Sequence, residues 1–255
     1  MLNSVRIVMV GTSHPGNIGA AARAMKTMGL ARLELVAPAE FPSVDATARA
    51  SGAAELLSDA RVHGDLAGAI DDATLVVGTS ARQRRIPWPC LTPRELAELV
   101  ATRGEQEKVA VLFGREDRGL TNEELRRCHY HVEIPANPDY GVLNVASAVQ
   151  LIGYELRLAL VGQEEGGEGD MFRNRHVLEL PPQRWDAPPA SSGELEHFLE
   201  HLERIMVKSG FLDPENPAQV VTRMRRLFLR ARPDRVEIST LRGVLTRLER
   251  GLEGR

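Results

Sequence analysis

Asn17, Gly19 and Arg23 are the first residues in the chain whose types and spacing could do chemistry. They follow an apolar run over residues 5–10 and a polar loop that contains glycine and proline. Arg23 comes one helical turn after Gly19, so a helix would place both residues on one face, beside the loop. A guanidinium in that place is a candidate functional group. The alternative is a solvated arginine on an ordinary helix surface.

The glycines of the same segment disfavour two nucleotide-binding signatures. Gly11, Gly16 and Gly19 are spaced as GxxxxGxxG, which differs from the GxGxxG of dinucleotide-binding folds. No Gly-Lys-Ser/Thr follows, so a P-loop is excluded. A nucleotide-dependent oxidoreductase is therefore disfavoured.

Two basic segments are candidates for contact with nucleic acid. Arg82, Arg84 and Arg85 precede Trp88, which stands between two prolines, so phosphate contact with base stacking competes with a solvent-facing charge run. Residues 219–250 contain nine arginines and three acids. With so few acids available for pairing, this basic arm favours an RNA-facing surface over a salt-bridged one.

Two histidine motifs resemble metal sites but favour structural roles. His197, Glu200 and His201 match HxxEH, yet the segment has the glutamates of an ordinary solvated helix face and no obvious third ligand follows. Cys128, His129 and His131 lack the second ligand pair that a zinc site requires. We expect no metal at either motif.

The elements that position these residues alternate between strand and helix. Strands are predicted at residues 5–10, 33–36, 73–78 and 109–113, and helices at 18–29 and 46–57. Capping boxes at Thr92 and Thr121 open two more helices. This pattern predicts an α/β domain with a mostly parallel sheet, whose ligand lies at the carboxyl ends of the strands, in loops 11–17, 79–88, 114–119 and 136–143.

The remaining chain is predicted to be a linker and a helical extension. Residues 161–192 lack periodicity and are rich in glycine and proline. Ser191 then opens a helix that ends near Ser209, and helical segments follow at 217–231 and 236–252. We therefore divide the chain into a domain at 1–160, a linker at 161–192 and a helical unit at 193–255.

Composition limits the setting of the protein. The 255 residues carry a formal net charge of −3 and no apolar run long enough for a membrane helix. The N-terminus lacks the features of a signal peptide, and the two cysteines, Cys90 and Cys128, suit a reducing compartment. A cytoplasmic protein without membrane contact is expected.

Three motifs, in this order and spacing, resemble the SPOUT class of RNA methyltransferases and, within it, the TrmH-like 2′-O-methyltransferases. The first runs from Asn17 through Arg23 to Gly29. The second contains Gly114, Arg115 and Glu116 and continues to Glu123, and the third runs from Ile134 to Asn144 and Ala146. Residues 78–82, the Pro-Trp-Pro and the arginines of 224–231 resemble a bacterial branch that methylates position 32 of the tRNA anticodon loop. The resemblance covers nearly the whole chain.

The resemblance implies an α/β fold with a C-terminal trefoil knot, a homodimer, tRNA as substrate and S-adenosylmethionine as methyl donor. The implied donor site is Thr79, Ser80, Ala81, Gly114, Ile134, Gly141, Val142 and Leu143. The implied RNA-facing or supporting residues are Asn17, Arg82, Arg84, Arg115, Glu116 and Asn144.

Arg23 is the residue to which the resemblance assigns catalysis. A guanidinium with a pKa above about 12 is a poor base, so we expect Arg23 to bind the phosphate beside the target ribose and to stabilise developing charge. One position departs from the family pattern: Val142 stands where many relatives have serine.

Two alternatives stay open on the sequence alone: a methyltransferase of ribosomal RNA, and an RNA-binding protein without catalysis. The basic arm argues against the first. Val142 favours the second, and Arg23 with an intact Gly114-Arg115-Glu116 opposes it.

Overall fold

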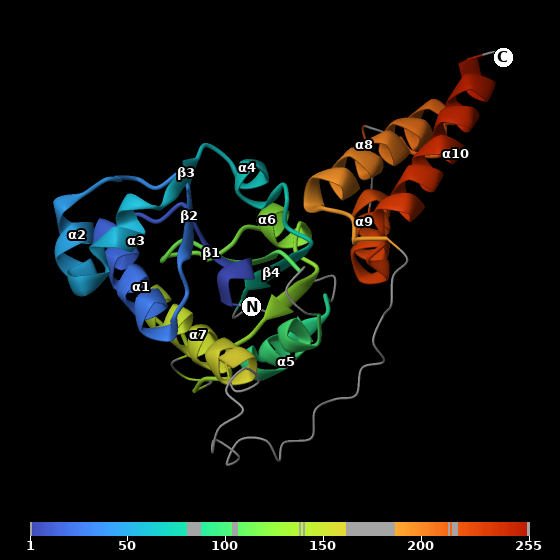
Figure 1. Ribbon diagram of the computed structural model, residues 1–255. Helices are drawn as coiled ribbons and strands as arrows, with labels where there is room; N and C mark the ends of the chain where they lie inside the picture. Colours follow the sequence, from blue (N-terminus) through green and yellow to red (C-terminus); the bar gives the residue numbers. More distant parts are fainter. Residues whose placement is uncertain are drawn as a thin grey trace. The chain divides into compact units, whose positions relative to one another are not determined.

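The structure is a computed structural model, and it describes residues 2–80, 88–103, 107–137, 139, 141–161, 187–213, 215 and 219–253. The chain divides into two compact units. The first is made of Met1–Ala69 and Leu75–Pro182, and the second of Ile70–Thr74 and Gln183–Arg255. Figure 1 shows the ribbon of each unit.

The first unit is built on a sheet whose strands, within the described part of the chain, are all parallel. The strands are β1 (Val5–Val10), β2 (Arg32–Val36), β3 (Arg61–His63), β4 (Leu75–Thr79), β5 (Cys90–Leu91), β6 (Val109–Phe113) and β7 (Tyr130–Val132). Their order in space is β3-β2-β1-β6-β4-β7-β5. All residues of β1 and β6 are buried, as expected for strands covered on both faces. The prediction of an α/β domain with a parallel sheet is confirmed.

Helices cover the sheet of this unit (Figure 1). They are α1 (Pro15–Met28), α2 (Val44–Ala50), α3 (Ala54–Ser58), α4 (Leu66–Ile70), α5 (Pro93–Arg103), α6 (Asn122–Arg126) and α7 (Val145–Val161). The main core lies between one face of the sheet and α1, α5 and α7, where Ile7, Met25, Leu96 and Ile152 are almost fully buried. This core fixes the ends of β4, β6 and β7, from which the candidate ligand loops leave.

Two helix predictions are corrected. Helix α1 begins at Pro15, three residues before the predicted start, because proline is preset for the first turn of a helix. The single helix predicted at 46–57 is two helices separated by a 3-10 turn at Ser51–Ala53. Ser51 has a φ of 51°, and Gly52 disfavours continuation of the helix. The Nζ of Lys26 binds the freed carbonyl of Gly52 at 2.7 Å.

The second unit contains α8 (Ser192–Lys208), α9 (Val220–Ala231) and α10 (Arg235–Glu253). The predicted capping box of Ser191 and Glu194 opens α8, and Gly210 follows its end with a φ of 74°. Phe198 of α8 meets Phe228 of α9 edge to face, with ring centroids 4.6 Å apart. The predicted helical extension is confirmed. Most of the linker predicted at 161–192 lies outside the described residues.

The trefoil knot stays a prediction, because strand order and pairing do not trace how the chain passes through its own loops. None of the helices in the described segments has the length and apolar composition needed to cross a membrane.

Candidate functional site

A pocket of about 680 Å³ opens at the carboxyl ends of the central strands in the first unit. Its walls come from the end of β4 at Thr79 and Ser80, the loop 114–119 after β6, the end of β7 and the loop that follows it, and residues 141–145 at the start of α7. A volume of this size lies within the range of about 300–1,000 Å³ typical of small-molecule sites. The site therefore occupies the place that parallel-sheet topology predicts.

Gly114 allows the loop after β6 to fold back on itself. A Cβ at this position would lie 2.1 Å from both the carbonyl carbon of Gly119 and the backbone nitrogen of Leu120. Two hydrogen bonds between the backbones of Arg115 and Gly119, of 3.2 and 2.8 Å, close the loop, and Gly119 has a φ of 69°. Only glycine permits this approach, so the loop presents its backbone to the pocket.

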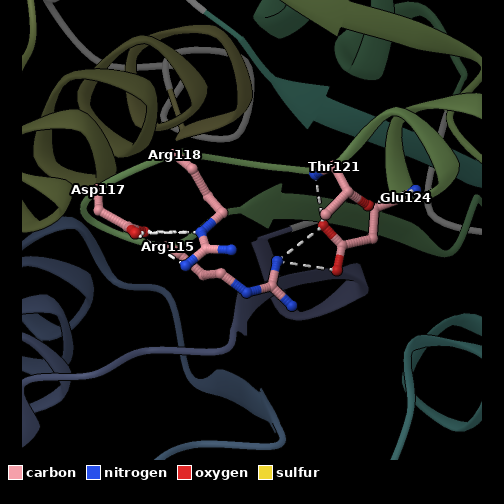
Figure 2. Close-up of polar contacts among 5 residues, drawn as sticks. All are labelled: Arg115, Asp117, Arg118, Thr121 and Glu124. Carbon is pink, nitrogen blue, oxygen red and sulfur yellow. Dashed lines mark hydrogen bonds and ion pairs between the residues drawn. The ribbon is translucent and has the colours of Figure 1, made fainter.

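Arg115 stabilises the same loop from the other side. Figure 2 shows its guanidinium directed at Glu124, whose two carboxylate oxygens lie 3.0 and 3.1 Å from Nη1. Glu124 also completes the capping box with Thr121 that opens α6. At the tip of the loop, Asp117 and Arg118 pair with each other (Figure 2). The sequence predicts that Arg115 orders the pocket or holds RNA, and the structure gives it an ion pair that stabilises a loop of the pocket wall.

Glu116 joins this loop to the start of α1. Its carboxylate accepts hydrogen bonds from the backbone N–H and hydroxyl of Ser13 at 3.1 and 2.8 Å, and from Nδ2 of Asn17 at 2.9 Å. Burial alone would raise the pKa of Glu116, but the hydrogen bonds from Asn17 and Ser13 outweigh it and lower the pKa to about 2. The carboxylate is therefore ionised at neutral pH and lies at the positive end of the helix dipole.

Asn17 extends the connection to the third loop. Its Oδ1 accepts a hydrogen bond of 3.3 Å from Nδ2 of Asn144, and Oδ1 of Asn144 accepts the N–H of Ala146 at the start of α7. A chain of polar contacts thus runs from the loop after β6, through α1, to α7. Three predicted site residues, Asn17, Glu116 and Asn144, meet in it.

Thr79 and Ser80 are held in the pocket wall by the neighbouring strands. The hydroxyl of Thr79 donates to the carbonyl of Leu112 at 2.9 Å, and the N–H of Ser80 donates to the carbonyl of Val132 at 3.0 Å. The remaining predicted donor-site residues that the structure describes also line the pocket: Gly114, Ile134, Gly141, Val142 and Leu143. Of these, Val142 is 77% exposed.

Arg23 is not among the residues that line the pocket. It lies on α1 with an exposed side chain. Ala81, Arg82 and Arg84 lie outside the described residues, so their predicted roles stay predictions.

Sequence reasoning missed five polar or charged residues of the pocket lining: His14, Asp45, Arg49, Asp117 and Arg118. Asp45 and Arg49 come from α2, where they form an exposed ion pair of 3.3 Å that packs against Gly16. Their i,i+4 spacing is a signal for an ordinary surface pair. Only the packing of α2 on α1 brings them to the pocket.

The two histidine motifs have structural partners. Nδ1 of His129 accepts the N–H of Val76 at 3.0 Å, and Nε2 of His131 lies 3.2 Å from the carbonyl oxygen of Leu125. Trp88 stacks on the His131 ring with centroids 5.7 Å apart, so that one face of the indole is covered. Nε2 of His201 lies 3.3 Å from a carboxylate oxygen of Glu249.

Comparison with known proteins identifies the class. Residues 4–154 match the SpoU rRNA Methylase family, and residues 193–255 match the C-terminal domain of the tRNA methyltransferase TrmJ. The first match covers the parallel-sheet domain with its pocket and defines the chain as a SpoU-type methylase.

Full-length relatives give the branch. A Pseudomonas aeruginosa protein named tRNA (cytidine/uridine/adenosine-2′-O-)-methyltransferase TrmJ is 48% identical, with coverage of 100% of this chain and 97% of the relative. A Pectobacterium atrosepticum TrmJ is 45% identical, with 98% of each chain covered. The crystal structure of TrmJ from Zymomonas mobilis (Z. mobilis ZM4) superposes with a TM-score of 0.79 at 34% identity and covers 96% of this chain and 98% of that one. The chain belongs to the TrmJ family of SpoU methylases.

Proposed function

We propose that this protein transfers a methyl group from S-adenosylmethionine to the ribose 2′-hydroxyl of position 32 in the tRNA anticodon loop, where the base is cytidine or uridine. The observation that carries the proposal is the meeting of the three motifs at one pocket in a chain that is 48% identical to a TrmJ over its full length. The match of 193–255 to the TrmJ C-terminal domain favours tRNA as the substrate.

The pocket fits S-adenosylmethionine in size and chemistry. The close fold-back at Gly114 presents loop backbone groups that can bind an adenine edge, and Val132, Ile134 and Leu143 offer apolar surface to the ring. When bound, this donor supplies an electrophilic methyl group on a sulfonium. The proposed donor-binding residues are Thr79, Ser80, Ala81, Gly114, Ile134, Gly141, Val142 and Leu143.

The chain of polar contacts from Glu116 through Asn17 to Asn144 fixes the positions of the pocket walls relative to one another. Alignment of the hydroxyl with the methyl group is the main catalytic task, and rigid walls supply it. Arg23 stands outside the lining, so its proposed work is on the RNA. Its guanidinium binds the phosphate beside the target ribose and stabilises developing charge, while the hydroxyl proton leaves to phosphate or water.

A homodimer is part of the proposal. Leu151 and Tyr154 of α7 are 42% and 46% exposed and lie three residues apart on one helix face. An exposed apolar patch of this kind fits a protein interface. A second copy of this chain would cover it.

The division of labour in the chain is proposed as follows. Residues 1–160 bind the donor and hold the reacting groups, 161–192 connect, and 193–255 form an RNA-binding extension. We place the enzyme in the cytoplasm, where its substrate is.

A ribosomal RNA substrate is the second candidate, because the family matched by residues 4–154 is described as an rRNA methylase. The RNA that the protein methylates distinguishes the two candidate functions. The full-length protein is incubated with labelled S-adenosylmethionine and either unmodified tRNA or ribosomal RNA, and the label is mapped. Label on the ribose of tRNA position 32 supports the proposal. Label on a base, on ribosomal RNA alone, or on neither RNA contradicts it.

A further inference from the structure

The nine arginines of residues 219–250 fall into three groups in the structure. Arg225 forms a two-pronged ion pair with Glu196 of α8 and is largely buried. Nε of Arg235 donates to Glu194 at 2.8 Å, and Arg232 is only 5% exposed. Arg225 and Arg235 thus join α9 and α10 to α8, and the buried Arg232 donates to the carbonyl of Thr74 at 3.4 Å. All three serve packing within the second unit.

Three others share the solvent side of α9: Arg223, Arg226 and Arg230. At about 100° per residue, they fall within an arc of roughly 60° around the helix. Residues three or four apart on one face are neighbours, with Cβ atoms about 5–6 Å apart, so the three guanidiniums form a row about 10 Å long. We call this row the arginine stripe.

The two ends of the stripe, Arg223 and Arg230, have no acidic partner among the described residues. Arg223 donates to the side-chain amide of Gln219, and Arg230 forms no ion pair with any residue that the structure describes. Leu227, between Arg226 and Arg230, is 42% exposed. The opposite side of the helix is the packed one, with Leu229 buried and Phe228 against Phe198.

The arginines of α10 are arranged differently. Arg242, Arg247 and Arg250 are exposed, but on the same geometry they spread over about 140° of the helix. They therefore add charge to the second unit without forming a row. Each helix thus has a set of three exposed or half-exposed arginines. The three of α9 lie in a row, and the three of α10 are spread around the helix.

We propose that the arginine stripe binds successive phosphates along one strand of the tRNA backbone. The spacing of the row suits a line of phosphates, and guanidinium groups are the side chains that bind phosphate with two hydrogen bonds. This inference rests on the proposed function. It assigns the RNA contact of the extension to α9, and it assigns Arg225, Arg232 and Arg235 to the fold.

The test compares two double variants of the full-length protein. Arg223→Gln with Arg230→Gln removes two charges from the stripe, and Arg242→Gln with Arg247→Gln removes two charges from α10. Binding of unmodified tRNA is measured by fluorescence anisotropy at several salt concentrations. All four side chains are exposed, and equal melting temperatures confirm that both variants fold.

The stripe variant is expected to weaken tRNA binding roughly tenfold and to lower the slope of log K against log salt by about 1.5, because each lost phosphate contact removes about 0.7–0.9 from the slope. The α10 variant is expected to change binding less than about twofold. For the stripe variant, KM for tRNA rises while kcat and donor affinity stay unchanged.

Equal losses of tRNA affinity in the two variants would show a diffuse electrostatic effect and would overturn the proposal that the arginine stripe binds phosphates. Unchanged binding in the stripe variant would overturn it as well. Both outcomes leave the proposed function intact as long as the wild-type protein methylates tRNA. A wild-type protein that neither binds nor methylates tRNA contradicts the proposed function itself.

Discussion

In the pocket of the first unit, Glu116 and Arg115 are held by their neighbours, whereas two arginines on α9 of the second unit face solvent. Glu116 accepts hydrogen bonds from Ser13 and Asn17, and Arg115 is bound by Glu124. Arg223 and Arg230 are exposed on one face of a helix. The difference indicates two kinds of recognition. Under the proposals above, the pocket would bind a small molecule with fixed backbone and apolar groups, and the exposed arginines of α9 would bind a polyanion.

This comparison predicts that changes in the pocket backbone have the largest effect. Gly114→Ala is expected to abolish measurable donor binding, because the new Cβ would lie 2.1 Å from backbone atoms of Gly119 and Leu120 that no side-chain rotation can relieve. Calorimetric titration with S-adenosylmethionine measures the loss. Gly52→Ala is the matched control, since its Cβ would have no neighbour within 4 Å. A Gly114→Ala protein that binds the donor within threefold of wild type would contradict the close fold-back.

Arg23→Ala comes next and separates donor binding from catalysis. Single-turnover methyl transfer is expected to fall by about 100- to 1,000-fold, the effect of removing one well-placed charge-stabilising group. Donor affinity should stay within twofold, because Arg23 is not part of the pocket lining. Arg23→Lys tests the forked geometry: substantial activity in this variant would count against it. A parallel loss of donor affinity in Arg23→Ala would contradict the assignment of Arg23 to the RNA.

Glu116→Gln tests the connection between the loop after β6 and α1. Thermal unfolding should show a loss of about 1 kcal/mol, typical of a side chain that binds a helix N-terminus. The pKa of Glu116 is lowered to about 2, below the usual 4.3 or so of the unfolded chain, so its stabilisation is present above about pH 4.3 and is lost as the pH falls toward 2.

The difference in the free energy of unfolding between wild type and Glu116→Gln should therefore be constant from pH 5 to 8. It should shrink toward zero as the pH falls toward 2. A difference that grows as the pH falls below 4 would contradict the ionised carboxylate.

Val142→Ser has the smallest expected effect. Val142 lines the pocket but is 77% exposed, so a hydroxyl there gains at most one partly solvated hydrogen bond. We expect the methylation rate to rise by about threefold, measured with saturating donor and tRNA. An unchanged rate would show that the hydroxyl is dispensable in this chain.

The fold was largely predictable, because its signals are local. The apolar run of β1, the capping box of Thr121 and Glu124, and that of Ser191 and Glu194 all depend on residues close in sequence. The break at Ser51 was not predictable in this way. The helix ends there because Ser51 has a positive φ, and Lys26 of α1 donates a hydrogen bond to the carbonyl of Gly52.

The site was predictable in part. The loops were placed by the rule that ligands lie at the carboxyl ends of parallel strands, and the resemblance supplied the residues. Spacing alone could not show that Glu116 binds Asn17, because the two are 99 residues apart. Nor could it show that Asp45 and Arg49 reach the pocket, since their pattern is that of any surface ion pair.

The central claim is transfer to one ribose hydroxyl, and a matched pair of substrates tests it most directly. Two unmodified tRNAs are prepared that differ only in the presence of the 2′-hydroxyl at position 32, and each is incubated with the protein and labelled S-adenosylmethionine. The account predicts one methyl group per molecule on the complete tRNA and none on the 2′-deoxy tRNA. Equal labelling of both would contradict it.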